Sequence, residues 1–213
     1  MKKKYTINEL PNIIPIFPLP GAVLLPQGNL PLNIFEPRYV AMVEKALGNN
    51  RLIGMIQPTS GKVKEKYNLY PVGCAGKIVS FTETTDNRYL IELEGLIRFK
   101  IKKEYEKIDG YRNIIPDWKT YAKDLEEPKV NIDISKLLDE LKVYFKKTNV
   151  NVDYEELSKI ASHHIIASVP QICSFKENEK QAVLEASTQD ERIEVLISLL
   201  KMYSTSNESE SIN

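Results

Sequence analysis

The sequence is poor in the residues that build metal, disulfide and nucleophilic sites. It holds two cysteines and two adjacent histidines in 213 residues, with no CxxC pair and no histidine at ligand spacing from a cysteine. This argues against a zinc site or a disulfide scaffold. We expect Cys74 and Cys173 to be buried free thiols in a reducing compartment. A nucleophilic pair of one of them with His163 or His164 stays open by composition alone.

Neither sign of charge is in excess. Lys and Arg number 29, and so do Asp and Glu, so no global field draws the chain to nucleic acid or to an anionic membrane. The three lysines at positions 2–4 are followed by no apolar signal-peptide core. We therefore expect a cytoplasmic protein without a membrane segment.

Charge is absent from one long stretch, between Glu9 and Glu36. A membrane span is nevertheless excluded there, because each interior proline costs a helix ~3 kcal/mol and lipid would leave the freed carbonyls unpaired. The prolines are Pro11, Pro15, Pro18, Pro20, Pro26 and Pro31. We expect short buried strands, one of them at 22–25, and then a helix from Pro37, since proline suits the first helical position.

Residues 1–118 carry mainly strand patterns. Apolar and alternating runs predict strands at 51–57, 74–81, 89–93, 97–101 and 111–115, with a surface loop at 59–66 and a break at Gly95. We interpret this part as a twisted antiparallel sheet or partly closed barrel that carries one helix.

Beyond a charged linker at 119–130, the apolar period becomes helical. Asp153, Ser174 and Thr188 each precede a glutamate by three residues, which is the pattern of a helix N-cap. The sequence therefore predicts a four-helix bundle at 131–203 and a disordered tail at 204–213. The expected fold class is α+β.

Several motifs resemble the N-terminal substrate-binding domain of Lon proteases. They are the run PIFPLPGAVLLPQGNLPLNIFEPRYVAMVEKAL, then RLIGMIQP, YPVGCAGKIVSF, RYLIELEGLIRFKI and EKQAVLEASTQDERIEVLISLL. They stand in the family's order and cover residues 12 to 203. The resemblance implies a PUA-like pseudo-barrel followed by helices.

The resemblance would also imply an ATP-dependent serine protease, but the catalytic parts are missing from this sequence. It has no GxxxxGK[ST] loop to hold nucleotide phosphates, and no room after residue 203 for a Ser–Lys protease domain. We expect a non-catalytic, stand-alone domain without cofactor or metal. By resemblance it would bind unfolded or apolar polypeptides, as an adaptor for a full-length Lon protease or as an independent holdase.

We predict that clients bury apolar side chains in a groove between the two subdomains, since apolar burial yields ~25 cal/mol per Å². The candidate lining residues are Val23, Leu24, Leu25, Leu30 and Met42, with core packing as the alternative. The motif residues that match the family are expected mainly to hold the fold, with Glu36 capping a helix and meeting Arg98. They are Phe35, Glu36, Pro37, Arg38, Tyr39, Gly95, Arg98, Lys180, Gln181 and Arg192.

The PUA-like resemblance leaves RNA binding as the alternative function. RNA-binding modules of this kind need a basic face with stacking aromatic rings. The candidates are Tyr89, Phe99, Tyr105 and Tyr111, interleaved with Arg88, Arg98, Lys100, Lys102, Lys103 and Arg112. The zero net charge disfavours nucleic acid as a partner.

Overall fold

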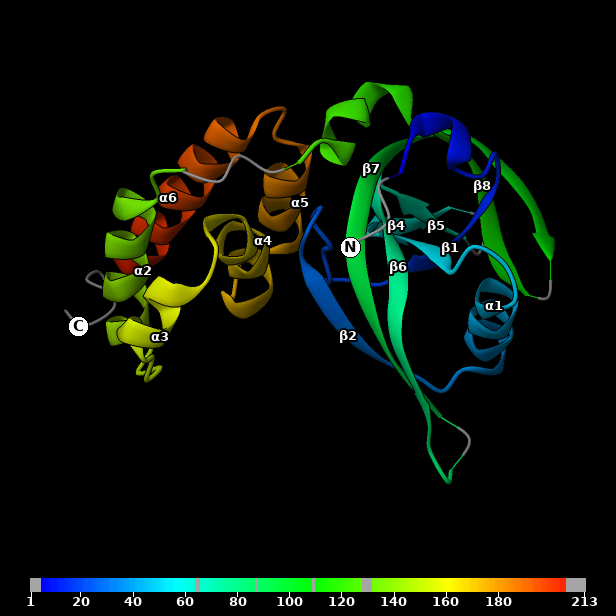
Figure 1. Ribbon diagram of the computed structural model, residues 1–213, viewed down its shortest axis with the longest axis horizontal. Coiled ribbons are helices and arrows are strands. Elements are labelled where there is room, and N and C mark those ends of the chain that lie inside the picture. The colour runs from blue at the N-terminus through cyan, green and yellow to red at the C-terminus, as the bar shows by residue number, and fades with distance from the viewer. Residues whose placement is uncertain (1–4, 64–65, 87, 109, 128–131, 206–213) are drawn as a thin grey trace. The chain divides into compact units, whose positions relative to one another are not determined.

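The computed structural model describes residues 5–63, 66–86, 88–108, 110–127 and 132–205. The chain divides into two compact units, residues 1–127 and 128–213. Strands dominate the first unit and helices make up the second (Figure 1). The fold class is therefore α+β, as the sequence predicted.

The first unit is a barrel with one α-helix. Its elements are η1 (Ile7–Glu9), β1 (Ile14–Pro18), β2 (Asn29–Ile34), α1 (Pro37–Leu47), β3 (Leu52–Ile56), β4 (Pro58–Val63), β5 (Lys66–Leu69), β6 (Val72–Glu83), β7 (Tyr89–Ile108), β8 (Tyr111–Asp117) and η2 (Lys119–Leu125). The predicted loop at 59–66 is wrong, because β4 and β5 pair there as a small hairpin. The predicted strand at 22–25 is also wrong, since this segment is a buried loop.

The main sheet closes on itself. Its strand order is β2-β7-β6-β3-β1-β8, and β8 pairs with β7 as well as with β1. The strands β7, β6, β3, β1 and β8 thus form a closed circuit. Strand β2 pairs with β7 and is not part of this circuit. The pair β1–β3 is parallel, with Ile16 opposite Gly54, whereas the sequence predicted an antiparallel sheet. The connection through β2 and α1 is long enough to bring β3 back parallel to β1, which a tight hairpin does not allow.

Strand β7 runs unbroken through Gly95, contrary to the predicted break. The missing side chain lets the loop before β2 cross the strand. A Cβ at residue 95 would clash with the backbone of Leu25, lying 2.8 Å from its carbonyl carbon. The Gly95 N–H donates to the carbonyl of Gly28 at 2.8 Å, and the Gln27 N–H donates to the carbonyl of Gly95 at 2.7 Å. Glycine is therefore needed at position 95 so that the loop backbone can approach β7 closely, and it does not interrupt the strand.

One apolar cluster fills the barrel. Phe99, which is fully buried, packs edge-on against Trp118 with ring centroids 6.0 Å apart. The Trp118 Nε1–H donates to the carbonyl of Pro11 at 3.0 Å, which ties the start of the chain to the end of β8. Since Trp118 is the only tryptophan, its fluorescence reports on the barrel.

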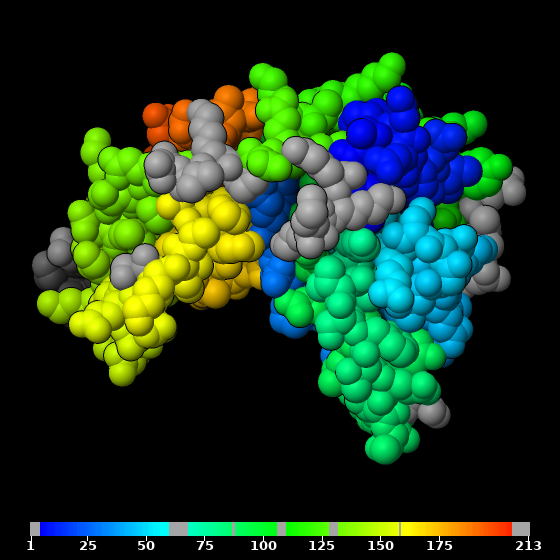
Figure 2. All heavy atoms as spheres, in the orientation of Figure 1, coloured from blue at the N-terminus to red at the C-terminus, as the bar shows by residue number. Residues whose placement is uncertain are grey.

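The β6–β7 hairpin extends beyond the rest of the barrel (Figures 1 and 2). The rings of Phe81 and Tyr89 lie 4.9 Å apart across the two strands. The Tyr89 hydroxyl donates to Glu44 of α1 at 2.8 Å. The hairpin and the single barrel helix therefore support one another.

The segment 119–130, predicted as a linker, is partly built into the barrel unit. Its residues 119–125 form η2, and Asp124 of η2 receives three hydrogen bonds from Arg98 of β7. The Arg98 Nε and Nη2 groups donate at 2.8 and 2.9 Å, and its backbone N–H donates at 3.0 Å. The Arg98 guanidinium also lies 4.3 Å from the centre of the Tyr121 ring.

Residues 132–205 of the second unit form five helices, whereas the sequence predicted four. They are α2 (Ser135–Lys147), α3 (Tyr154–Lys159), α4 (Ser162–Ile172), α5 (Glu177–Glu185) and α6 (Gln189–Thr205). The extended backbone of Ile160 separates α3 from α4. Of the predicted tail, residues 204 and 205 end α6, and residues 206–213 lie outside the described part of the chain.

Two of the three predicted helix caps are confirmed. Asp153 accepts hydrogen bonds from the N–H groups of Glu155 and Glu156, and the Thr188 hydroxyl accepts one from the N–H of Glu191. The cap predicted at Ser174 is displaced. Instead α5 begins after Lys176, whose N–H donates to Glu179 at 2.7 Å.

Candidate functional site

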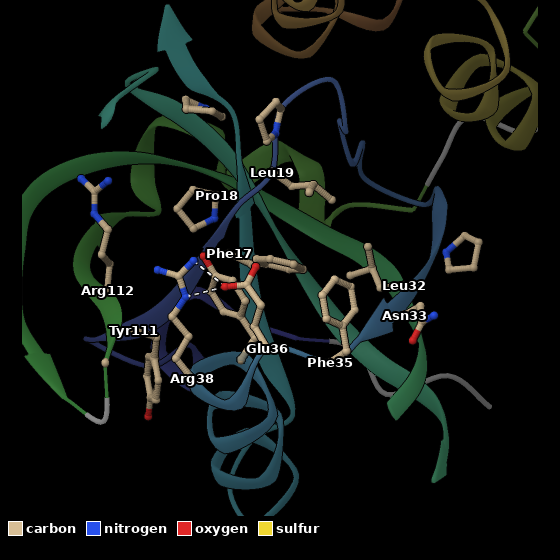
Figure 3. Close-up of a pocket in the computed structure, with 15 residues that line it drawn as sticks. Phe17, Pro18, Leu19, Leu32, Asn33, Phe35, Glu36, Arg38, Tyr111 and Arg112 are labelled. Atoms are coloured by element: carbon tan, nitrogen blue, oxygen red, sulfur yellow. Dashed lines mark hydrogen bonds and ion pairs between the residues drawn. The ribbon is translucent and has the colours of Figure 1, made fainter. Parts of the chain in front are cut away.

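The barrel unit has a pocket of about 570 Å³ beside the first turn of α1 (Figure 3). It is bounded by the end of β1 and the residues after it, by β2, and by the start of β8. Most of its wall is proline or aromatic: Phe17, Pro18, Pro20, Pro31, Phe35, Tyr39, Pro58 and Tyr111. This size and apolar character are typical of ligand-binding pockets.

The motif residues 35–39 form one side of this pocket. Pro37 occupies the first turn of α1, as predicted. Glu36 stands at the N-cap position of α1, but its carboxylate makes no capping hydrogen bond and instead binds Arg38 (Figure 3). The Arg38 Nη2–Glu36 Oε2 distance is 2.6 Å, and both side chains are about half exposed. The predicted Glu36–Arg98 contact is wrong, because Arg98 is bound by Asp124 on η2.

Tyr39 and Phe17 contribute two aromatic rings to the pocket lining. Their ring centroids lie 4.3 Å apart, and both residues are buried. The Arg38 guanidinium lies 4.5 Å from the centre of the Tyr39 ring. Burial raises the pKa of Tyr39, so its phenol stays neutral at physiological pH.

Among the barrel residues whose burial is described, Phe35 is the most exposed large apolar side chain, at 62%. It lies on the pocket wall next to Leu32 (Figure 3). The Arg88 guanidinium is 5.7 Å from the centre of its ring. A partner that covered this ring would remove apolar surface from water, which is favourable.

The five residues first predicted to contact clients lie elsewhere. Val23, Leu24, Leu25, Leu30 and Met42 are all buried, with at most 8% of their surface exposed. We therefore correct that assignment in favour of core packing, the alternative that the sequence had left open. The signal that identifies the pocket in the sequence is the FEPRY run, which we had expected to be mainly structural.

Three further motif residues lie on the helices of the second unit. Arg192 of α6 is buried and donates to the carbonyl of Val183 on α5 at 3.3 Å. Gln181 is also buried, and its amide donates to Glu185 at 2.7 Å. Lys180 is half-buried, and this burial lowers its pKa.

The residues proposed for RNA stacking do not form an exposed aromatic face. Of the four aromatic residues only Tyr105 is exposed, whereas Tyr89, Phe99 and Tyr111 are buried. Four of the six basic residues have carboxylate partners, in the pairs Arg88–Asp86, Arg98–Asp124, Lys102–Asp117 and Arg112–Glu104. The alternative of a nucleic-acid module is therefore not favoured.

A cysteine nucleophile is disfavoured by burial. Cys74 and Cys173 are both free and buried, and burial raises the pKa of Cys173 to about 12. We expect neither thiol to react with Ellman's reagent in the native chain at pH 8, whereas both should react once urea unfolds it, because the thiolate is the reactive form. Rapid native-state release of one equivalent of thionitrobenzoate would contradict this and restore the Cys–His alternative.

In the described part of the chain, no three His, Cys, Asp or Glu side chains gather in a way that could hold a metal ion. Within the same ranges, no helix combines the length and apolar character needed to cross a membrane.

Comparison with known proteins identifies relatives over most of the chain. Residues 13–202 match the model of the ATP-dependent protease La (LON) substrate-binding domain. The Lon protease of Desulfosudis oleivorans is 27% identical over 75% of this chain and 18% of its own length. Lon protease 2 of Myxococcus xanthus is 25% identical over 91% of this chain and 24% of its own length. The chain thus spans less than a quarter of either relative.

Solved structures show the same fold. The crystal structure of a Lon N-terminal domain protein from Xanthomonas campestris aligns with a TM-score of 0.62 at 18% identity, covering 87% of this chain and 97% of that one. The N-terminal domain of a Mycobacterium avium complex Lon protease aligns with a TM-score of 0.60 at 13% identity, covering 89% and 98%. The family match extends over most of the chain, so this protein belongs to the LON substrate-binding domain family.

Proposed function

We propose that this chain is a non-catalytic recognition domain that binds apolar segments of unfolded polypeptides in the barrel pocket. The observation that carries the proposal is the exposed Phe35 on the wall of a proline- and aromatic-lined pocket. The family supplies the class of ligand, since its description is a substrate-binding domain. This pocket replaces the groove and the five buried residues that we first predicted.

The composition of the pocket suits apolar, weakly selective binding. Proline side chains present apolar surface, are conformationally fixed and lack a backbone N–H, so covering them leaves no donor unpaired and costs little side-chain entropy. The Glu36–Arg38 pair balances its own charge at the rim. Affinity should therefore come mainly from apolar burial and depend little on salt.

The first test is binding of a fluorescent, reduced and carboxymethylated polypeptide, with a labelled single-stranded RNA in parallel at low and high salt. Replacing Phe35 with serine should weaken polypeptide binding roughly tenfold, because most of a phenylalanine side chain contributes ~1.5 kcal/mol when buried. Fluorescence anisotropy measures both ligands on the same protein.

Ile172→Ser is the matched control. Ile172 is exposed to a similar extent, at 58%, and does not line the pocket, so this variant should bind as the wild type does. Equal losses in both variants would show non-specific apolar adhesion. Binding to RNA alone, lost steeply as salt rises, would replace the proposal with the nucleic-acid alternative.

The two roles proposed for such binding give opposite kinetic results. Added to a full-length Lon protease and an unfolded client, an adaptor should accelerate degradation of the client. An independent holdase should slow it, because client held in the pocket is withdrawn from the protease. At sub-saturating protein, Phe35→Ser should reduce whichever effect is observed.

A further inference from the structure

Strand β2 is an open edge of the main sheet in the described part of the chain. It pairs with β7 on one side, from Asn29 opposite Glu94 to Ile34 opposite Tyr89, and stands at one end of the strand order. An edge strand presents a row of backbone N–H and C=O groups on which another strand can pair.

The hydrogen bonds of the chain just before β2 show which backbone N–H and C=O groups of β2 face the open side. The carbonyl of Gly28 accepts a hydrogen bond from Gly95 of β7, so Gly28 faces β7. The backbone N–H and C=O groups of successive residues point alternately to the two sides of a strand. Those of Leu30, Leu32 and Ile34 therefore face β7 as well. Asn29, Pro31 and Asn33 therefore turn their backbone groups toward the open edge.

Pro31 supports the same assignment. A proline lacks the N–H that a ladder requires and is tolerated in a sheet where its nitrogen faces away from the partner strand. The open edge consequently offers three carbonyls and two N–H groups. The gap at Pro31 lowers the tendency of two such edges to pair continuously, as edge prolines do.

This edge borders the apolar pocket. Pro31, Leu32 and Asn33 line the pocket together with Phe35, and Phe17 to Pro20 lie on its wall as well. Leu30 and Ile34 share one face of β2 with Leu32 and are buried, whereas Leu32 is only half-buried. The edge of β2 thus places backbone groups that can pair with another strand beside an apolar pocket that can hold a side chain.

We propose that a client segment binds as an added β-strand on the open edge of β2, with an apolar side chain in the pocket. This deepens the proposed function and rests on it. An extended polypeptide complements both features, because its backbone pairs with the edge while alternate side chains project to one face. Recognition would then require an unfolded backbone and one apolar anchor, which explains selection of unfolded clients without a fixed sequence.

The test uses wild-type full-length chain and a capped nine-residue peptide of alternating threonine and valine, with a central phenylalanine and a lysine at each end. A set of peptides carries one N-methyl group each, at successive positions. N-methylation at every second position should weaken binding at least about fivefold, since it removes a donor and adds a clash. The positions between should stay within about twofold.

The phase of this alternation gives the strand direction. Sensitivity at the two neighbours of the phenylalanine indicates antiparallel pairing, and sensitivity at the phenylalanine itself indicates parallel pairing. Equal tolerance at all positions, or failure of the nonapeptide under conditions where the carboxymethylated polypeptide binds, overturns strand addition but leaves the proposed function standing. If neither ligand binds, the proposed function itself fails.

A pair of protein variants tests the same edge. Asn33→Pro removes the side chain and the edge N–H, whereas Asn33→Ala removes the side chain alone, so the difference between them reports the donor. Asn33→Pro should bind the peptide about fivefold more weakly than Asn33→Ala. Self-association of the wild type that is lost in Asn33→Pro would show that a second copy occupies the edge, and would overturn the proposal.

Discussion

Replacing Gly95 with alanine should destabilise the barrel by roughly 4 kcal/mol or more, a loss that only severe backbone or core disruption produces. The added Cβ would clash with the Leu25 backbone and lie 3.2 Å from Cγ of Leu24. A backbone atom cannot rotate away as a side chain does, so the loop must leave β7. Its two hydrogen bonds to Gly95 would then be strained or lost. Urea unfolding followed by Trp118 fluorescence measures the effect.

Gly48→Ala is the control from the same unit. Gly48 ends α1 with helical backbone angles, and the nearest atoms to an added Cβ lie 3.7 and 3.8 Å away. Alanine there should leave the barrel unchanged or slightly more stable, because it restricts the unfolded chain. If Gly95→Ala unfolds at the wild-type urea concentration, the close crossing of loop and strand is not as described.

Replacing Asp124 with alanine should cost about 3–5 kcal/mol, the usual penalty for removing one member of a buried ion pair. The side chains of Arg98 and Asp124 are only 4% and 10% exposed. Without the carboxylate, the guanidinium charge stays in the protein interior and the Arg98 N–H loses its acceptor. The same Trp118 signal should report an early barrel transition.

Asp86→Ala tests whether burial of the ion pair is the reason for the large loss of stability expected in Asp124→Ala. Asp86 also pairs with an arginine, Arg88 at 2.7 Å, but both side chains are about half exposed. Surface pairs contribute little to stability, so this variant should unfold with the wild type. Equal destabilisation by both substitutions would show that the net charge of the barrel, and not the buried Arg98–Asp124 pair, sets its stability.

Local sequence patterns predicted the elements that depend on local physics. Pro37 begins α1, and Asp153 and Thr188 cap their helices, because each of these features is set within one turn. The unbroken β7 and the parallel β1–β3 pair were missed because both depend on distant partners. In particular, Gly95 resembles a strand breaker until the crossing loop at Leu25 is known.

The candidate site was predicted only in part for the same reason. The sequence marked residues 35–39 as a motif but assigned the client surface to apolar residues at 23–25, which the fold buries. Periodicity does not separate an apolar residue in a core loop from one on a pocket wall. Likewise, the partner of Arg98 lies in the segment 119–130, whose charged composition predicted a linker.

Hydrogen–deuterium exchange of the full chain, with and without saturating carboxymethylated polypeptide, tests the central claim most directly. Binding in the barrel pocket predicts slowed exchange at the amides of the non-proline lining residues, which are Phe17, Leu19, Leu32, Asn33, Phe35, Glu36, Arg38, Tyr39, Gly110, Tyr111 and Arg112. The open edge of β2 predicts that the Asn33 amide is among the most strongly protected. Protection confined to 132–205, or none at saturation, would contradict the assignment of client binding to this pocket.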